Sequence, residues 1–228
     1  RQAQLLTHYL WRVKDNNVYV RDGFLLAYEQ NFEDGFTYKA SLSAIFSYSN
    51  GERKESLFSD EEISFAIRDF EPYKIDEFDD ERFDLKYPSS DVFFKNKGSE
   101  RMSRAFYFIL AARASSILPI KIVNYCTALE CLFTIGNSEI NHKIAERVAI
   151  ILGTSVETKV QLFNLIKQAY NIRSCIVHGQ YLKGSDEDLK SISQELDQIL
   201  RKLINEKHDI FSKAANEIES FFTKLLFS

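Results

Sequence analysis

Apolar residues recur three and four positions apart from about residue 101 to the C-terminus, which is typical of amphipathic helices. A first helix is expected between a cap at Ser99 and Ile117, and Pro119 breaks it and fits the first turn of the next helix. Further helices are predicted to stop at Gly136, to span Ser138 to a C-cap at Gly153, to span Ser155 to Gly179, and to run from Ser185 through Leu203 towards Leu225. Whether that last stretch is one helix or breaks near Asn205 stays open.

The first hundred residues carry weaker and more mixed patterns. A helical pattern over Leu5 to Leu10 is followed by turn residues at 15–17 and by a short apolar stretch from Phe24 to Ala27. Ser59 precedes two acidic residues, as at the start of a helix. Strand patterns are weak and confined to this part, for example from Tyr38 to Tyr48. The sequence therefore predicts a mainly α fold with a helical and mixed N-terminal extension.

The composition of the chain changes between Pro88 and Ser99. Residues 1–97 hold 13 basic and 19 acidic side chains, whereas residues 98–183 hold 10 basic and 5 acidic ones. We divide the chain into an acidic, aromatic-rich region at 1–97, whose role the sequence does not reveal, and a helical domain at 98–228. The net charge of −4 argues against a generic nucleic-acid coat, but the basic segment would accept a polyanionic ligand.

Composition also excludes several classes of protein. The content of 45% hydrophobic residues is enough for a substantial core, and no apolar run reaches the roughly 20 residues of a membrane span. The N-terminus does not resemble a signal peptide, so a cytoplasmic protein without a membrane partner is expected, and the start at Arg1 fits a fragment of a longer chain. The three cysteines are expected to be reduced core residues, and the acidic run at 76–81 a solvated loop rather than a cation site. We therefore expect no metal and no cofactor.

Candidate chemistry lies at the end of the helix that is predicted to stop at Gly179. Arg173 and His178 are strongly polar side chains in an otherwise apolar helix end, with Tyr170 and Ser174 beside them. A guanidinium can hold a phosphate, and an imidazole can exchange a proton with a ribose hydroxyl or a leaving oxygen, so the pair suits metal-free RNA cleavage. Positions five apart diverge by about 140° on a helix. Either the helix end unwinds at Gly179, or two copies of the chain build the site together as a homodimer.

The spacing of these two residues is weak evidence, because an Arg followed by four to six residues and a His occurs three times in the chain. The surrounding segments are more specific. Three ordered blocks, Ala128 to Phe133, His142 to Ala149 and Tyr170 to Gly179, resemble the HEPN domains of the ApeA-like type. The resemblance covers roughly residues 101–205.

This resemblance implies an all-α bundle of four or five helices that dimerises, with a ribonuclease site across the dimer. It also implies a role in bacterial antiviral defence or as a toxin. Arg173 and His178 would be the catalytic residues, Ser174 the polar residue after the arginine, and Glu130 an accompanying acid. Many toxin members carry a tyrosine two residues after the histidine, whereas this chain has Gln180 there and Tyr181 next.

Structural interpretations stand beside the functional ones. A cation and a glycine are favourable at any helix C-terminus, so Arg173, His178 and Gly179 could serve the helix alone. Glu130 needs a partner in an apolar helix, for which Arg147 or Arg173 would serve, and that pair is either structural or a support for catalysis.

The other polar candidates also have two interpretations each. His142, Lys143 and Arg147 could contact an RNA backbone or form a solvated helix face. His8 and His208 are expected on the surface, and the C-terminal apolar stripe in the core or a dimer seam.

Two functional classes are consistent with these residues. One is a metal-independent endoribonuclease, and the other is a module of the same fold that binds RNA, a nucleotide or a protein without cutting. A regulatory protein partner or an upstream domain would fit either class.

Overall fold

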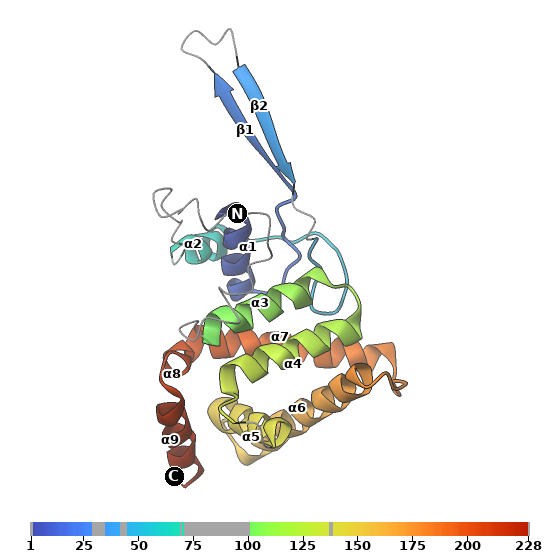
Figure 1. The fold of residues 1–228 in the computed structure, drawn as a ribbon, viewed down its shortest axis with the longest axis vertical. Coiled ribbons are helices and arrows are strands. Elements are labelled where there is room, and N and C mark those ends of the chain that lie inside the picture. The colour runs from blue at the N-terminus through green and yellow to red at the C-terminus, as the bar shows by residue number, and fades with distance from the viewer. Residues whose placement is uncertain are drawn as a thin grey trace.

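The computed structural model describes residues 2–28, 35–41, 45–68, 70, 101–136 and 139–227, and it is mainly helical, as predicted (Figure 1). The elements in chain order are α1 (Gln2–Val13), β1 (Asp22–Tyr28), β2 (Gly35–Ser41), α2 (Asp60–Arg68), α3 (Arg101–Ala114), α4 (Leu118–Phe133), α5 (Ile140–Leu152), α6 (Val156–Val177), α7 (Asp186–Glu206), α8 (His208–Phe211) and α9 (Ala215–Leu226). Within these residues, no helix combines the length and the hydrophobicity of a membrane span.

Polar caps start several helices where the sequence predicts them. Ser155 begins α6 and Ser185 begins α7, each with a capping box in which the serine side chain accepts from a backbone N–H three residues on. Ser59 does the same for α2, since its hydroxyl accepts from the backbone N–H of Glu62 at 3.2 Å. Pro119 lies in the first turn of α4, as expected.

The ends of the helices differ from the prediction in places. The helix α3 ends at Ala114 rather than Ile117, and α4 ends at Phe133 before Gly136. The last helical stretch is divided, because α7 stops at Glu206 and α8 and α9 follow as separate pieces. The predicted caps at Ser99 and Ser138 and the acidic run at 76–81 lie outside the described residues.

Gly153 is the C-cap of α5, as predicted, but for a different reason. Its φ of −78° is open to any residue, so a left-handed conformation does not explain the glycine. A Cβ atom here would lie 2.6 Å from the carbonyl oxygen of Ala149 and 3.0 Å from the Cα of Lys159. The glycine therefore permits a close approach between the end of α5 and the start of α6.

The helix α4 lies at the centre of the bundle and contacts α3, α5, α6 and α7 (Figure 1). Its apolar residues, among them Ile122 and Leu129, pack in one core with residues of the surrounding helices. Trp11 of α1 is fully buried in the same core. The described residues on both sides of the predicted boundary near residue 97 thus share a hydrophobic core.

A two-stranded antiparallel hairpin of β1 and β2 stands away from the helices (Figure 1). The apolar stretch from Phe24 to Ala27 is part of β1, and Phe24 lies opposite Lys39 of β2. The strand pattern predicted from Tyr38 to Tyr48 is confirmed up to Ser41 only, because residues 45–48 form no strand.

A buried carboxylate joins three helices that are distant in the sequence. Asp197 of α7 is fully buried and accepts hydrogen bonds from the indole N–H of Trp11 at 2.7 Å and from the hydroxyl of Tyr125 at 3.0 Å. Arg201, one turn further along α7, lies 2.8 Å from the other carboxylate oxygen. Burial raises the pKa of Asp197 to about 6, although Arg201 opposes that rise. The carboxylate thereby links α1, α4 and α7.

Two buried cations hold the N-terminal region against the bundle. The guanidinium of Arg113 in α3 donates to the backbone carbonyl of Thr7 at 3.2 Å and to the side chain of Asn16 at 3.1 Å. The ammonium group of Lys121 in α4 donates to the carbonyl of Ala112 in α3 at 2.9 Å and to the carbonyl of Ser47 in the N-terminal region at 3.5 Å. Burial lowers the pKa of Arg113 to about 10 and that of Lys121 to about 8.

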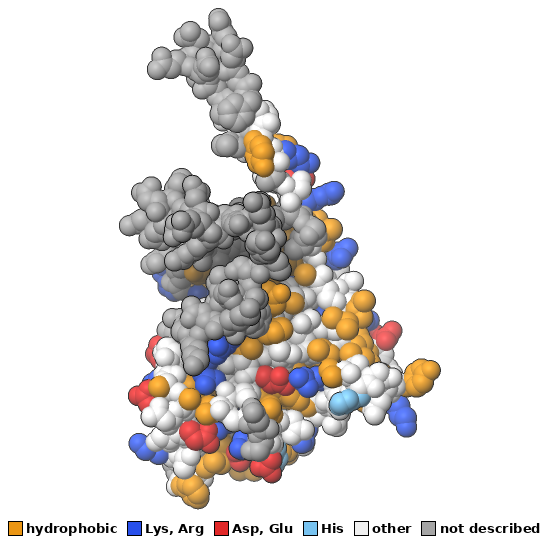
Figure 2. All heavy atoms as spheres, in the orientation of Figure 1, with side chains coloured by type: hydrophobic (Ala, Val, Ile, Leu, Met, Phe, Trp, Pro, Cys, Tyr) orange, Lys and Arg blue, Asp and Glu red, His pale blue; other side chains and the backbone are white. Residues whose placement is uncertain are grey.

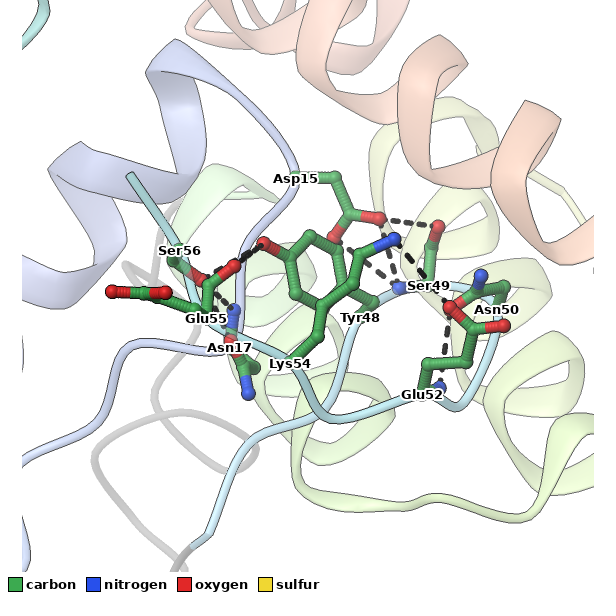
Figure 3. A network of polar contacts seen from close by, with 9 residues as sticks. All are labelled: Asp15, Asn17, Tyr48, Ser49, Asn50, Glu52, Lys54, Glu55 and Ser56. Atoms are coloured by element: carbon green, nitrogen blue, oxygen red, sulfur yellow. Dashed lines mark hydrogen bonds and ion pairs between the residues drawn. The ribbon is translucent and has the colours of Figure 1, made fainter. Parts of the chain in front are cut away.

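A second set of polar contacts fixes residues 45–56 against the end of α1 (Figure 3). The carboxylate of Asp15 accepts from the backbone N–H of Ser49 at 2.9 Å and from its hydroxyl at 2.6 Å, and Figure 3 shows the two residues facing each other. The hydroxyl of Ser56 donates to Asn17 at 2.6 Å. The hydroxyl of Ser193 in α7 donates to the carbonyl of Ser49 at 2.5 Å, which ties this segment to the bundle as well.

The prediction that His8 lies on the surface is wrong. Only 9% of the residue is exposed, because α1 turns it towards α3, where its ring meets Phe106 edge-on. Burial, together with a smaller effect of the charge on Arg113, lowers the pKa of His8 to about 4. The side chain of His208 lies outside the part of the chain that is described.

We predict that Asp197→Ala lowers the free energy of unfolding by about 3 to 5 kcal/mol, because Arg201 would lose its carboxylate while Trp11 and Tyr125 keep buried donors without an acceptor. Chemical denaturation measures this loss. Glu195→Ala on an exposed position of the same helix is the control and should change stability by less than about 0.5 kcal/mol. Equal stability of the two variants would contradict the role of the buried carboxylate.

We predict that His8 makes stability fall with decreasing pH. The unfolded chain takes up a proton near pH 6.5 and the folded chain only near pH 4, so the contribution of His8 is complete above pH 6.5 and is lost towards pH 4. The loss amounts to about 3 kcal/mol. Denaturation curves of the wild type and His8→Leu across this pH range measure the contribution of His8. Asp197 contributes to stability with the opposite sign, and its contribution cancels when the two proteins are compared. Parallel pH profiles for the two proteins would refute the prediction.

Candidate functional site

Glu130 of α4 and Arg173 of α6 form an ion pair between two neighbouring helices. The Nη2 atom of Arg173 lies 3.2 Å from each oxygen of the Glu130 carboxylate. Of the two partners expected for Glu130, the structure therefore selects Arg173. The pair is only partly exposed, with 31% of the Arg173 side chain and 22% of the Glu130 side chain accessible.

Tyr170 supports this pair from the preceding turn of α6. Its ring lies beneath the guanidinium of Arg173, with 6.0 Å between the guanidinium carbon and the ring centre. Its hydroxyl donates to the carbonyl oxygen of Cys126 at 3.2 Å, one turn before Glu130 on α4. Burial raises the pKa of Tyr170 well above that of a free phenol, so this side chain stays protonated and acts by position.

Burial and the neighbouring charge have opposite effects on the pKa of Glu130. Burial raises the pKa of Glu130, whereas the positive charge of Arg173 and the hydroxyl of Tyr170 lower it. Burial also raises the pKa of the Cys126 thiol, which therefore remains protonated at neutral pH. All three cysteines are free; Cys126 is a core residue as expected, while Cys131 and Cys175 are only half-buried.

The end of α6 is a regular C-cap with a left-handed glycine. The backbone N–H of Gly179 bonds to the carbonyl of Ile176 at 3.1 Å, and that of Gln180 bonds to the carbonyl of Cys175 at 2.8 Å, which is the Schellman arrangement. Gly179 has a φ of +66°, a conformation that favours glycine. The expected capping role of Gly179 is confirmed.

Arg173 and His178 do not converge within one chain. The helix stays regular to Val177, so the helical geometry separates the directions of the two side chains by about 140°. Arg173 turns to Glu130, whereas His178 and Ser174 are exposed, and neither of these two side chains forms a hydrogen bond or ion pair with a described residue. The structure thus brings together Glu130, Tyr170 and Arg173 and leaves His178 and Ser174 facing outward.

Arg147 lies in the core rather than on a solvated helix face. Only 5% of the residue is exposed; its Nη1 atom donates to the carbonyl of Phe133 at 2.7 Å, and its Nη2 atom pairs with Glu219 of α9. The alternative of a solvated face is wrong for this residue. Its contacts count against an RNA contact too, whereas Lys143 is half-buried and its RNA contact stays a prediction.

The role of Cys126 could not be predicted from its position in an apolar helix, which indicates only a core residue. Its backbone carbonyl, not its thiol, anchors the hydroxyl of Tyr170. The four-residue spacing of Cys126 and Glu130, which places both on one side of a helix, was the available clue. Among the described residues, no three or more His, Cys, Asp or Glu side chains group as metal ligands would.

No protein-family model, curated protein or solved structure matches the chain. The similarity of three sequence blocks to HEPN domains therefore stays an expectation. A functional proposal for this chain depends on the geometry of α4 and α6.

We predict that Arg173→Gln raises the pKa of Glu130 above its value in the wild type, because the variant removes the charge that offsets burial. Arg173→Lys keeps a positive charge and should give a smaller rise. Carbon NMR of the glutamate carboxyl group measures both. An unchanged pKa in Arg173→Gln would show that the two groups do not interact in solution.

Proposed function

We propose that this protein is a metal-independent endoribonuclease that cleaves RNA at a site shared by two copies of the chain. The observation that supports it is the division of the two candidate catalytic groups between opposite sides of the end of α6. Arg173 is held by Glu130 and Tyr170, and His178 is exposed beyond it. When two such helix ends face each other across a two-fold axis, the histidine of one chain meets the arginine of the other.

The chemistry of this site would be transesterification within the RNA strand. The imidazole of one His178 accepts the proton of a ribose 2′-hydroxyl as that oxygen attacks the adjacent phosphorus. The bond between phosphorus and the 5′-oxygen breaks, and the 5′-oxygen takes a proton from the second His178. The products are a 2′,3′-cyclic phosphate and a 5′-hydroxyl, and no metal takes part.

Arg173 would stabilise the negative charge that develops on the phosphate oxygens. Its Nη2 atom is committed to Glu130, which leaves the N–H groups of Nη1 for the phosphate. Glu130 and Tyr170 would act as positioning residues, since they fix the guanidinium without touching the substrate. Ser174, one residue further and exposed, could donate to the same phosphate.

The biological setting rests on the resemblance to HEPN domains. A cytoplasmic ribonuclease of bacterial antiviral defence, or a toxin, fits that resemblance. The second candidate is a binding module without catalysis, and one observation favours it. Glu130 offsets the charge of Arg173, which would weaken a phosphate-stabilising role.

We predict that the wild type cleaves RNA in EDTA and that His178→Ala and Arg173→Ala each lower the rate by at least about 100-fold, the usual effect of removing a general base or a charge-stabilising group. Gel analysis with end-labelled RNA measures the rate and identifies the cyclic phosphate. Lys213→Ala, an exposed cation after α8, is the matched control and should cleave like the wild type.

The oligomeric state provides an independent check. The proposal requires a dimer in analytical ultracentrifugation at the protein concentration of the assay. A wild type that leaves RNA intact, or two active-site variants that cut as fast as the wild type, would leave the binding module as the function. A strictly monomeric active enzyme would remove the shared site.

A further inference from the structure

From Thr158 onwards, α6 and the loop that follows it contain no acidic residues. No Asp or Glu occurs between Thr158 and Lys183, although the whole chain holds 33 acidic residues and has a net charge of −4. The same stretch carries Lys159, Lys167, Arg173 and Lys183. This segment therefore repels a polyanion less than a segment with the average composition of the chain would.

Amide and hydroxyl groups take the place of charges on the exposed positions of this helix. Gln161, Asn164, Gln168, Asn171 and Ser174 are all exposed, and their spacing of three and four residues makes each a surface neighbour of the next along α6. Solvated helix faces are usually covered by Glu and Lys pairs. Amides both donate and accept, so they can bond to phosphate oxygens, ribose hydroxyls and base edges.

Tyr181 is exposed to solvent in the loop that follows the end of α6. The residue is 96% exposed, and Val177 in the last turn of α6 is 56% exposed. On the right of Figure 2, where α6 ends, basic and histidine side chains lie at the surface beside a projecting hydrophobic one. An aromatic ring that is exposed to solvent suits stacking on an unpaired base.

A hollow of about 340 Å³ lies between α6 and the first half of α7, and residues 182–185 of the connecting loop also line it. Gln168, Asn171 and Lys183 contribute polar groups to its lining, and Leu182 contributes an apolar one. Two carboxylates also line it, and one of them, on Asp188, is occupied with capping Ser185. The hollow offers a polar wall with amide and lysine groups, against which one nucleotide can lie.

We propose that the amide line of α6 (Gln161, Asn164, Gln168, Asn171 and Ser174) together with Tyr181 is the surface that binds a single RNA strand and leads it to His178. The inference rests on the proposed function. From residue 161 to residue 178 the surface measures about 25 Å along the helix axis. Tyr181 is a specificity-determining residue, since its ring stacks on an unpaired base beside the phosphate that is cleaved.

The geometry favours a strand of RNA over a second copy of the chain on this surface. A two-fold axis near His178 brings only the ends of the two α6 helices together. The amide line then runs away from the axis in each copy and stays open to a ligand. Duplex RNA would fit less well, because its bases are paired and unavailable to Tyr181.

Binding is measured by fluorescence anisotropy with a labelled single-stranded RNA and the full-length His178→Ala variant, which binds without cutting. Adding Tyr181→Ala should weaken binding by about 5- to 100-fold, whereas Tyr181→Phe should restore it, because stacking needs only the ring. Adding Asn164→Glu and Gln168→Glu together should weaken binding by more than 10-fold. Asn216→Glu and Ser220→Glu on exposed positions of α9 make the same charge change elsewhere and should bind like the parent.

The outcomes separate this surface from the cleavage chemistry. RNA binding that depends on Tyr181 in a protein that never cuts would refute the ribonuclease and support the surface. Cleavage and binding that are both insensitive to Tyr181→Ala and to the two glutamates would overturn the surface and leave the ribonuclease standing. Dissociation of the dimer by the glutamates with unchanged RNA affinity, or equal affinity for duplex RNA, would also overturn it.

Discussion

The buried carboxylate of Asp197 is the interaction on which the arrangement of the other helices depends. A charge in the core is tolerable only when hydrogen bonds and an opposite charge surround it, and its donors come from residues as far away in the sequence as Trp11. The indole can reach the carboxylate only if α1 lies across α7, and the hydroxyl of Tyr125 only if α4 lies beside both. Apolar packing favours many arrangements of these helices, whereas the carboxylate accepts very few of them.

The geometry of the candidate site depends on that arrangement, because α4 belongs to both. Tyr125 points to Asp197, and the next residue, Cys126, offers its carbonyl to Tyr170 of α6. Glu130, one turn on, holds Arg173 from the same helix. One central helix therefore meets the buried charge with one side and sets the position of the guanidinium with the other. The direction of Arg173 is a property of the whole bundle and not of α6 alone.

Local features of the structure were readable from the sequence, whereas distant contacts were not. Capping depends on hydrogen bonds to residues a few positions away, so the capping roles of Ser155, Ser185 and Gly179 could be predicted. For the ion pair of Glu130, the sequence left two arginines as possible partners. The burial of His8 was missed because a histidine can lie on either side of an amphipathic helix, and only α3 decides which side of α1 is covered. The apolar stretch from Phe24 to Ala27 was assigned to no helix or strand, since the strand that pairs with it begins only at Gly35.

Both ends of α6 are held at defined residues, by the tight contact of Gly153 with Lys159 at its start and by the left-handed Gly179 at its end. A helix clamped in this way cannot absorb a change in length by sliding. One residue inserted or deleted between its start and Arg173 would turn the rest of the helix by about 100° and take Arg173 away from Glu130. Evolution of this segment is therefore confined to replacing side chains, and its length between the two glycines is expected to be constant in any lineage that keeps the site.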